Sequence, residues 1–174
     1  MTSGLARQIA GQPPEKTLSE SARSLVLGFG NVLLSDDGAG VQILAQLRSM
    51  PGSQTARFID AGTLSFSLLP YIEAANSMLA IDAAEIDGCP GTIGLYEGSA
   101  MDAFLRSTRR RTVHEVGLID LLDMARLSGC LPQRRALLCI QPGRIDWSEQ
   151  LSPPVAAALP EAARRASALL EQWQ

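Results

Sequence analysis

Residues 24–48 read SLVLGFGNVLLSDDGAGVQILAQLR, and this stretch decides the fold because its hydrophobic period changes partway along. The run from Ser24 to Leu27 is short and mostly apolar, which is typical of a strand buried on both faces. From Val41 onward, apolar residues recur every three or four positions, which indicates a helix. The stretch therefore predicts a strand, a loop and a helix. The loop lies at the carboxyl end of the strand, where open α/β sheets usually bind their ligands.

The predicted loop is rich in glycine and carries two adjacent carboxylates, Asp36 and Asp37. One Asp before a helix is commonly a cap or a first-turn residue, but two exceed what a single cap needs, and a nearby cation would relieve their repulsion. Gly28-Phe29-Gly30 begins like a dinucleotide-binding fingerprint, yet Leu33 replaces its third glycine and the acidic pair would repel a pyrophosphate. The loop suits a cation or a neutral polar ligand better than a phosphate.

The rest of the chain alternates apolar runs with helical segments and turns. Strands are predicted at 55–60 and 77–84, joined by a helix that begins or kinks near Pro70, so parallel strands with right-handed crossovers are expected. Residues 92–97 follow a turn too short for a helix, which predicts an edge or antiparallel strand. The remaining predicted elements are a short helix at 101–105, a helix at 115–127, a strand at 136–140, and a C-terminal helix from Ser152 that Pro160 should kink or divide.

These elements predict a three-layer α/β fold, with a mainly parallel sheet of about five strands between helices on both faces. The chain has 174 residues, the size of one domain, and we predict a flexible leader at 1–23 and a single α/β domain at 24–174. A net charge of −3 gives no general attraction to nucleic acid or anionic membranes. No run is long enough to span a bilayer, and the N-terminus lacks the apolar core of a signal peptide.

The three cysteines, at positions 89, 130 and 139, are odd in number and form no C-x-x-C pair. Neither a disulfide framework nor a thiolate zinc site is therefore indicated, and the cytoplasm is the predicted compartment.

Four carboxylates and one histidine are the candidate site residues. Asp37 and Asp60 follow the first two predicted strands, with Asp36 and Asp82 nearby, and the topology should bring them to one rim. His114 is the only histidine and directly precedes a predicted helix. Clustered carboxylates raise one another's proton affinity unless a cation is held, and carboxylates with one imidazole suit zinc or nickel. Each also has a structural alternative: Asp82 as a turn cap, Asp60 as an orienting group, and the histidine as a surface or satisfied core residue.

Familiar hydrolase motifs are missing from the sequence. There is no G-x-S-x-G elbow, and His114-Glu115 has no second histidine to complete H-E-x-x-H, so an ordinary zinc peptidase is not indicated. The run Arg109 to Arg111 is either a solvated turn or a contact for a carboxylate-bearing partner. Trp147 is either an anchor of a small core or part of a docking surface, and the sequence does not decide between them.

Three blocks of this sequence together resemble the signature blocks of hydrogenase maturation endopeptidases. The blocks are Gly28-Phe29-Gly30-Asn31 with Asp36-Asp37-Gly38-Ala39-Gly40, then Asp60-Ala61-Gly62-Thr63, then His114-Glu115-Val116-Gly117-Leu118. The closing stretch is also similar to the tail of that family, through Gln141-Pro142, Ile145-Asp146-Trp147 and Leu151-Ser152-Pro153. The match runs in order from about Leu25 to near the C-terminus, so only the leader lies outside it.

The resemblance implies an endopeptidase that removes the C-terminal extension of the nickel-iron hydrogenase large-subunit precursor after nickel insertion. It places the catalytic and metal-contacting positions on Asp37, Asp60 and His114. The nickel would be that of the precursor, the protein partner, rather than a permanently bound metal. Many relatives have Glu in place of Asp37, and because Asp has a shorter reach, a share for Asp36 stays open. Whether the metal polarises the carbonyl or a carboxylate activates water also stays open.

Two other functions remain as alternatives. The main one is a non-catalytic metal-binding or metallochaperone module that uses the same three residues. The second is a nucleotide or flavin binder on a similar sheet, against which the missing third glycine and the acidic rim both count. A purely structural interaction protein fits least, because the glycine-rich loop and the acids at the strand ends would then have no use.

Overall fold

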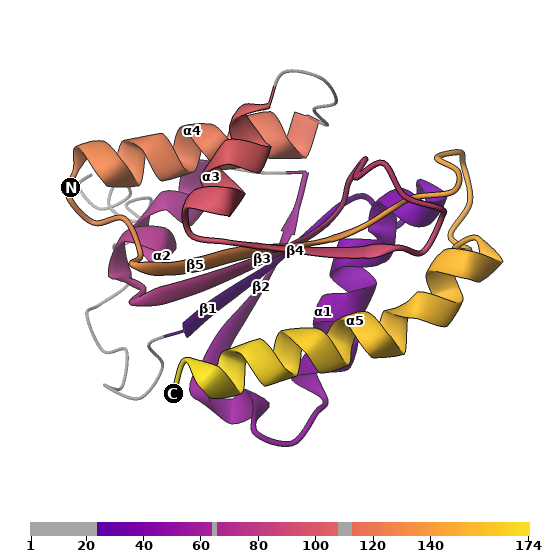
Figure 1. The fold of residues 1–174 in the computed structure, drawn as a ribbon, viewed down its shortest axis with the longest axis horizontal. Coiled ribbons are helices and arrows are strands. Elements are labelled where there is room, and N and C mark those ends of the chain that lie inside the picture. Colours follow the sequence, from indigo (N-terminus) through magenta and orange to yellow (C-terminus); the bar gives the residue numbers. More distant parts are fainter. Residues whose placement is uncertain (1–23, 64–65, 108–112) are drawn as a thin grey trace, which may run out of the picture.

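Five strands form one mixed sheet in the order β2-β1-β3-β5-β4 (Figure 1). The computed structural model describes residues 24–63, 66–107 and 113–174, without the side chains of 54 and 113–116, so the predicted leader lies outside the described residues. Neighbouring strands are parallel except β4, which pairs antiparallel with β5 at one edge, as predicted. The strands are β1 (Ser24–Phe29), β2 (Ala56–Gly62), β3 (Ser77–Ala83), β4 (Ile93–Glu97) and β5 (Arg134–Ile140).

Helices cover both faces of the sheet, which confirms the predicted three-layer α/β fold (Figure 1). Alternate residues of β3 point to opposite faces, so Leu79 and Ile81 join one apolar cluster while Met78 and Ala80 join the other. One cluster is covered by α1 (Ala39–Arg48) and α5 (Pro153–Gln172). The other is covered by α2 (Leu69–Ala74), α3 (Ser99–Arg106) and α4 (Val113–Leu127).

Two boundaries differ from the sequence-based expectations. The helix α5 runs for 20 residues with Pro160 inside it, so of the two expected effects of this proline, division of the helix is wrong, and a kink stays a prediction. Proline removes one backbone hydrogen bond, but buried neighbours such as Leu159 and Ala163 hold the segment against the sheet, and such packing supplies most helical stability. The helix α4 begins at Val113, so His114 lies in its first turn rather than in the loop before it.

Two positions in and after the loop that follows β1 require glycine. Gly30 has a φ of +123°, and a Cβ there would lie 1.9 Å from the backbone oxygen of Asp37. A Cβ on Gly40 would lie 2.3 Å from the carbonyl oxygen of Phe29 and 2.5 Å from that of Ile81. Only glycine therefore lets the start of α1 pack directly onto the ends of β1 and β3.

The strand order reverses between β1 and β3, because the chain first steps from β1 out to β2 and then returns past β1. In open α/β sheets, ligands bind beyond the carboxyl ends of the strands at such a reversal. The helix α4 leads into parallel strand β5, so it runs opposite to the strands, and its first turn lies at the same end of the sheet (Figure 1). Among the described residues, no helix has both the length and the apolar character that crossing a membrane requires.

Candidate active site

The carboxylate of Asp36 is fully buried and accepts four hydrogen bonds. The backbone N–H groups of Gly143 and Arg144 donate to its Oδ2 at 2.7 and 3.0 Å. Ser152 donates twice, from its backbone N–H to Oδ1 at 2.6 Å and from its Oγ to Oδ2 at 2.7 Å. We call Asp36 with these three partners the buried anchor. It fastens the loop between β5 and α5 to the loop after β1.

The donors of the buried anchor also decide the charge state of Asp36. Burial by itself would raise the pKa of this carboxyl, but the hydrogen bonds from Ser152, Arg144 and Gly143 outweigh burial and hold the pKa below its usual value. Asp36 therefore carries its negative charge inside the protein. Because both of its oxygens already accept hydrogen bonds, Asp36 holds the structure together, and its geometry does not support a share in the role expected of Asp37.

Asp37 lies in the loop that follows β1, Asp60 lies near the carboxyl end of the neighbouring strand β2, and we call this pair the strand-end rim. Oδ2 of Asp37 accepts a hydrogen bond from the backbone N–H of Asn31 at 2.7 Å. The next residue back, Gly30, donates its N–H to the carbonyl oxygen of Gly62 at 3.0 Å, and Gly62 in turn donates its N–H to Oδ1 of Asp60 at 2.9 Å. These backbone hydrogen bonds connect the two carboxylates at the carboxyl end of the sheet. Asp37 is 7% exposed, whereas Asp60 is open to solvent.

Asp82 does not belong to the strand-end rim. It lies within β3 and is only 2% exposed, and its Oδ1 accepts the N–H of the following residue, Ala83, at 2.8 Å. By strand alternation it is on the same face as Met78 and Ala80, the face that α4 covers. Of the four candidate carboxylates, then, two are deeply buried and two form the rim.

The side chain of His114 lies outside the described residues, so its predicted place at the site stays a prediction. The first turn of α4, which contains it, is at the carboxyl end of the sheet, where Asp37 and Asp60 also lie. Over the side chains that the structure describes, no three His, Cys, Asp or Glu residues converge as a metal site. The arginine run at 109–111 also lies outside the described residues.

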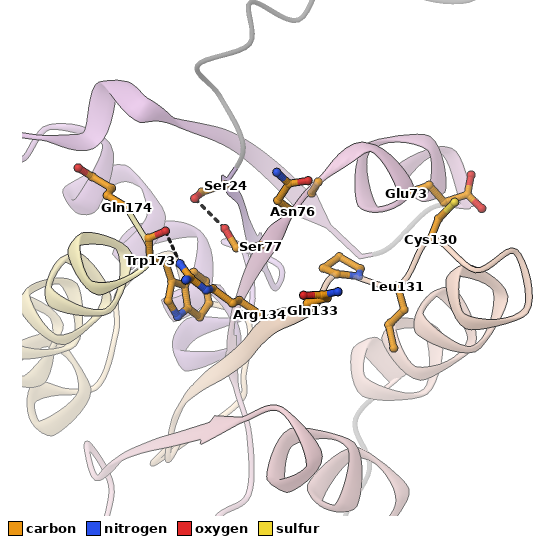
Figure 2. A pocket seen from close by; sticks show the side chains of 12 residues that line it. Ser24, Glu73, Asn76, Ser77, Cys130, Leu131, Gln133, Arg134, Trp173 and Gln174 are labelled. Atoms are coloured by element: carbon orange, nitrogen blue, oxygen red, sulfur yellow. Dashed lines mark hydrogen bonds between the residues drawn. The ribbon is translucent and has the colours of Figure 1, made fainter.

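A cavity of about 660 Å³ lies at the opposite end of the sheet, where β1, β3 and β5 begin (Figure 2). Ser24 and Ser77 share a hydrogen bond of 2.7 Å on its wall, and Arg134 donates to the carbonyl oxygen of Trp173. This cavity faces the amino ends of the parallel strands. It is therefore remote from the strand-end rim, and we do not assign the active site to it.

Sequence reasoning made Ser152 the start of a capped helix and assigned neither Ser152 nor Gln141 a role at the site, yet both hold loops near it. Oε1 of Gln141 accepts the N–H of Ile86 at 2.8 Å and its Nε2 donates to Glu85, which fixes the turn after β3. Both residues fall in the closing stretch that resembles the family, and this resemblance was the sequence feature that could have indicated their importance. The partners Ile86, Glu85 and Asp36 lie 55, 56 and 116 positions away, so no local pattern could reveal these contacts.

None of the three cysteines forms a disulfide; Cys139 is buried, whereas Cys89 and Cys130 are exposed.

The fold and the strand-end rim define a doubly wound α/β protein with paired carboxylates at its strand reversal. A family model described as hydrogenase maturation protease matches residues 41–169. The chain therefore belongs to the hydrogenase maturation protease family and is a peptidase, as the three blocks led us to expect. The matched range contains Asp60 and His114, whereas Asp37 lies just before it.

Individual relatives agree with this assignment. The hydrogenase expression/formation protein HupD of Rhodobacter capsulatus is 33% identical over 155 residues, covering 87% of this chain and 72% of that protein. The hydrogenase 2 maturation protease of Escherichia coli is 29% identical over 154 residues, covering 86% of this chain and 92% of its own length. Among solved structures, the hydrogenase maturating endopeptidase HybD of Escherichia coli superposes with a TM-score of 0.78 and 28% identity, over 86% of this chain and 93% of that one.

Proposed function

We propose that this peptidase removes the C-terminal extension of a nickel-iron hydrogenase large-subunit precursor, and that it does so after nickel has been inserted. The observation that carries the proposal is the strand-end rim, which holds two carboxylates at the strand reversal of a maturation-protease fold. The relatives are named for hydrogenase formation and hydrogenase maturation, which supports this class of substrate. The cytoplasm is the compartment we propose for the reaction.

In this proposal, Asp37, Asp60 and His114 contact the nickel that the precursor already holds. Two carboxylates and one imidazole leave coordination positions for ligands from another protein, which suits a metal that arrives with the substrate. Backbone hydrogen bonds from Asn31 and Gly62 fix the carboxylate oxygens, so the acids are oriented before the substrate binds. Contact with the nickel then positions the scissile peptide at the strand-end rim.

Hydrolysis adds water to the scissile carbonyl carbon, breaks the C–N bond, and transfers a proton to the leaving amine. The chain's contribution is to position that carbonyl next to a carboxylate able to accept a proton from water. Asp37 and Asp60 are the groups at the rim able to take this role, whereas Asp36 is fully occupied by its four donors.

Mass measurement of the large-subunit precursor, before and after exposure to the purified chain, tests the proposal. We expect the nickel-loaded precursor to lose a C-terminal peptide and the nickel-free precursor to stay intact. Efficient cutting of nickel-free precursor would overturn recognition of the metal. Transfer of nickel without any shortening would instead identify a metallochaperone.

A further inference from the structure

The described residues leave seven large apolar side chains exposed, and four of them lie on two neighbouring segments beside Asp37. Val32 and Leu33, 43% and 45% exposed, are in the loop after β1, while Ile145 and Trp147, 54% and 82% exposed, are in the loop between β5 and α5. We call these four residues the apolar patch. Such a concentration of apolar side chains usually marks a surface that contacts another molecule.

Backbone hydrogen bonds hold the two segments side by side. Ser148 donates its N–H to the carbonyl oxygen of Leu33 at 3.1 Å, and Ser35 donates its N–H to the carbonyl oxygen of Ser148 at 2.6 Å. These bonds flank a parallel bridge between Leu34 and Ser148. Leu33 and Trp147 each directly precede a residue of this bridge. The patch is therefore one surface, although its two halves are far apart in the sequence; the loop from β5 to α5 runs beside the start of α1 (Figure 1).

The buried anchor makes this surface rigid. Asp36 holds both ends of the loop that carries Trp147, through Gly143 on one side and Ser152 on the other. The Oγ of Ser35 adds a hydrogen bond to the carbonyl oxygen of Gln150 at 3.0 Å. A contact surface that is ordered beforehand loses little conformational entropy on binding, which favours affinity.

The patch is continuous with the strand-end rim, because the segment that carries Val32 and Leu33 leads through Asp36 directly into Asp37. A polypeptide bound at Asp37 would lie next to this surface, because Asn31, the residue before Val32, donates its N–H to Oδ2 of Asp37. We infer that the apolar patch binds apolar side chains of the large-subunit precursor next to its scissile bond, with Trp147 as the main anchor. This inference rests on the proposed function and names the surface through which the substrate is held.

Exposure of Trp147 also answers a question that the sequence left open. An anchor of a small core would be buried, whereas this indole is 82% exposed and directly precedes Ser148, which pairs with the loop after β1. Aromatic side chains of this kind commonly supply the largest single contributions to protein–protein binding.

The test compares Trp147→Ala with Leu127→Ala, which removes an equally exposed apolar side chain at the far end of α4, where the amino ends of the strands lie. Initial rates of precursor shortening are measured by mass spectrometry over a range of nickel-loaded precursor concentrations. We expect Trp147→Ala to raise KM roughly tenfold with kcat within about twofold, as for an interface anchor. Leu127→Ala should match the original chain, and Trp147→Phe should restore most of the affinity.

An unchanged KM in Trp147→Ala would overturn the inference, as would an equal loss in Leu127→Ala or a fall in kcat alone. Thermal unfolding checks that each variant is folded. Direct binding separates this inference from the proposed function: in a Trp173→Phe background, the emission of Trp147 should shift to shorter wavelength when precursor is added. If that shift occurs while the precursor is never shortened, the docking surface stands and the proposed cleavage fails.

Discussion

The buried anchor and the strand-end rim begin at adjacent residues, Asp36 and Asp37, yet the two regions are built for different purposes. Asp36 is surrounded by four donors from the far end of the chain and faces no solvent. Asp37 is tied to the local loop through Asn31 and shares an edge with Asp60, which is open to solvent. The comparison teaches that an Asp pair does not behave as one acidic site. Asp36 is held inside the structure by its donors, whereas Asp37 is the member that we propose contacts the substrate.

The largest expected effect concerns His114, which we propose acts together with the two carboxylates of the strand-end rim. Replacing His114 with Ala should abolish precursor shortening while the protein stays folded, because no other histidine can supply an imidazole. Mass spectrometry of the precursor and circular dichroism of the variant measure the two properties. Full processing by this variant would remove His114 from the mechanism.

Replacing Asp36 in the buried anchor should have the opposite effect and lower the stability of the protein. Asp36→Ala leaves four donors without their acceptor, two of them on buried Ser152, and should lower the free energy of unfolding by about 3–5 kcal/mol. Urea unfolding measures this change. Asp146→Ala is a suitable control, because its contact with Arg144 is a 3.9 Å surface ion pair that contributes at most about 0.5 kcal/mol. A stable Asp36→Ala protein would contradict the distinction between the two regions.

Asp60→Asn tests whether the strand-end rim, unlike the buried anchor, affects activity without affecting stability. The amide oxygen can still accept the N–H of Gly62, so the fold should be unchanged, but the negative charge is lost. We expect kcat/KM for precursor shortening to fall by about 100-fold, the size of effect that a misplaced reacting group produces. Asp120→Asn, on the exposed side of α4, provides the matched control. If both variants process the precursor equally well, Asp60 has no role in the reaction.

A smaller loss is expected when one donor of the anchor is removed. Ser152→Ala deletes the Oγ hydrogen bond to Asp36 but keeps the backbone N–H bond. The free energy of unfolding should fall by about 1.5–3 kcal/mol at most, since the lost hydrogen bond is to a charged acceptor. Urea midpoints of this variant and of Asp36→Ala, measured together with the double variant, show whether the two losses overlap. Fully additive losses would mean that the two residues do not act through one contact.

The pH dependence of stability gives the most subtle test. The pKa of Asp36 is lowered in the folded protein from its ordinary value of 3.8, so below that value the unfolded chain binds a proton that the folded chain does not. Stability from this group is therefore present above the ordinary pKa and is lost as the pH falls through the folded pKa. Asp102 adds to the same trend, because the hydrogen bond from Arg135 lowers its pKa. Urea midpoints between about pH 6 and pH 3 should fall, and Asp36→Asn should flatten this slope.

Much of the fold follows from local pattern. The change of period in residues 24–48 predicted β1 and α1, and the short turn after β3 predicted that β4 would be antiparallel. Boundaries were less predictable. Pro160 does not divide α5, because burial of Leu159 and Ala163 stabilises a helix that local preference would interrupt.

For the candidate site, sequence determined which chemical groups are available: an acidic pair after the first strand, a third acid after the second, and a single histidine. Only the tertiary structure decided that Asp36 is structural, because its donors at Gly143 and Ser152 lie 107 and 116 positions along the chain. Only the tertiary structure, too, placed the segment that carries exposed Trp147 beside the segment that carries Leu33. The physical reason is that local sequence fixes backbone preference, whereas burial and hydrogen-bond partners depend on segments that meet only when the sheet has formed.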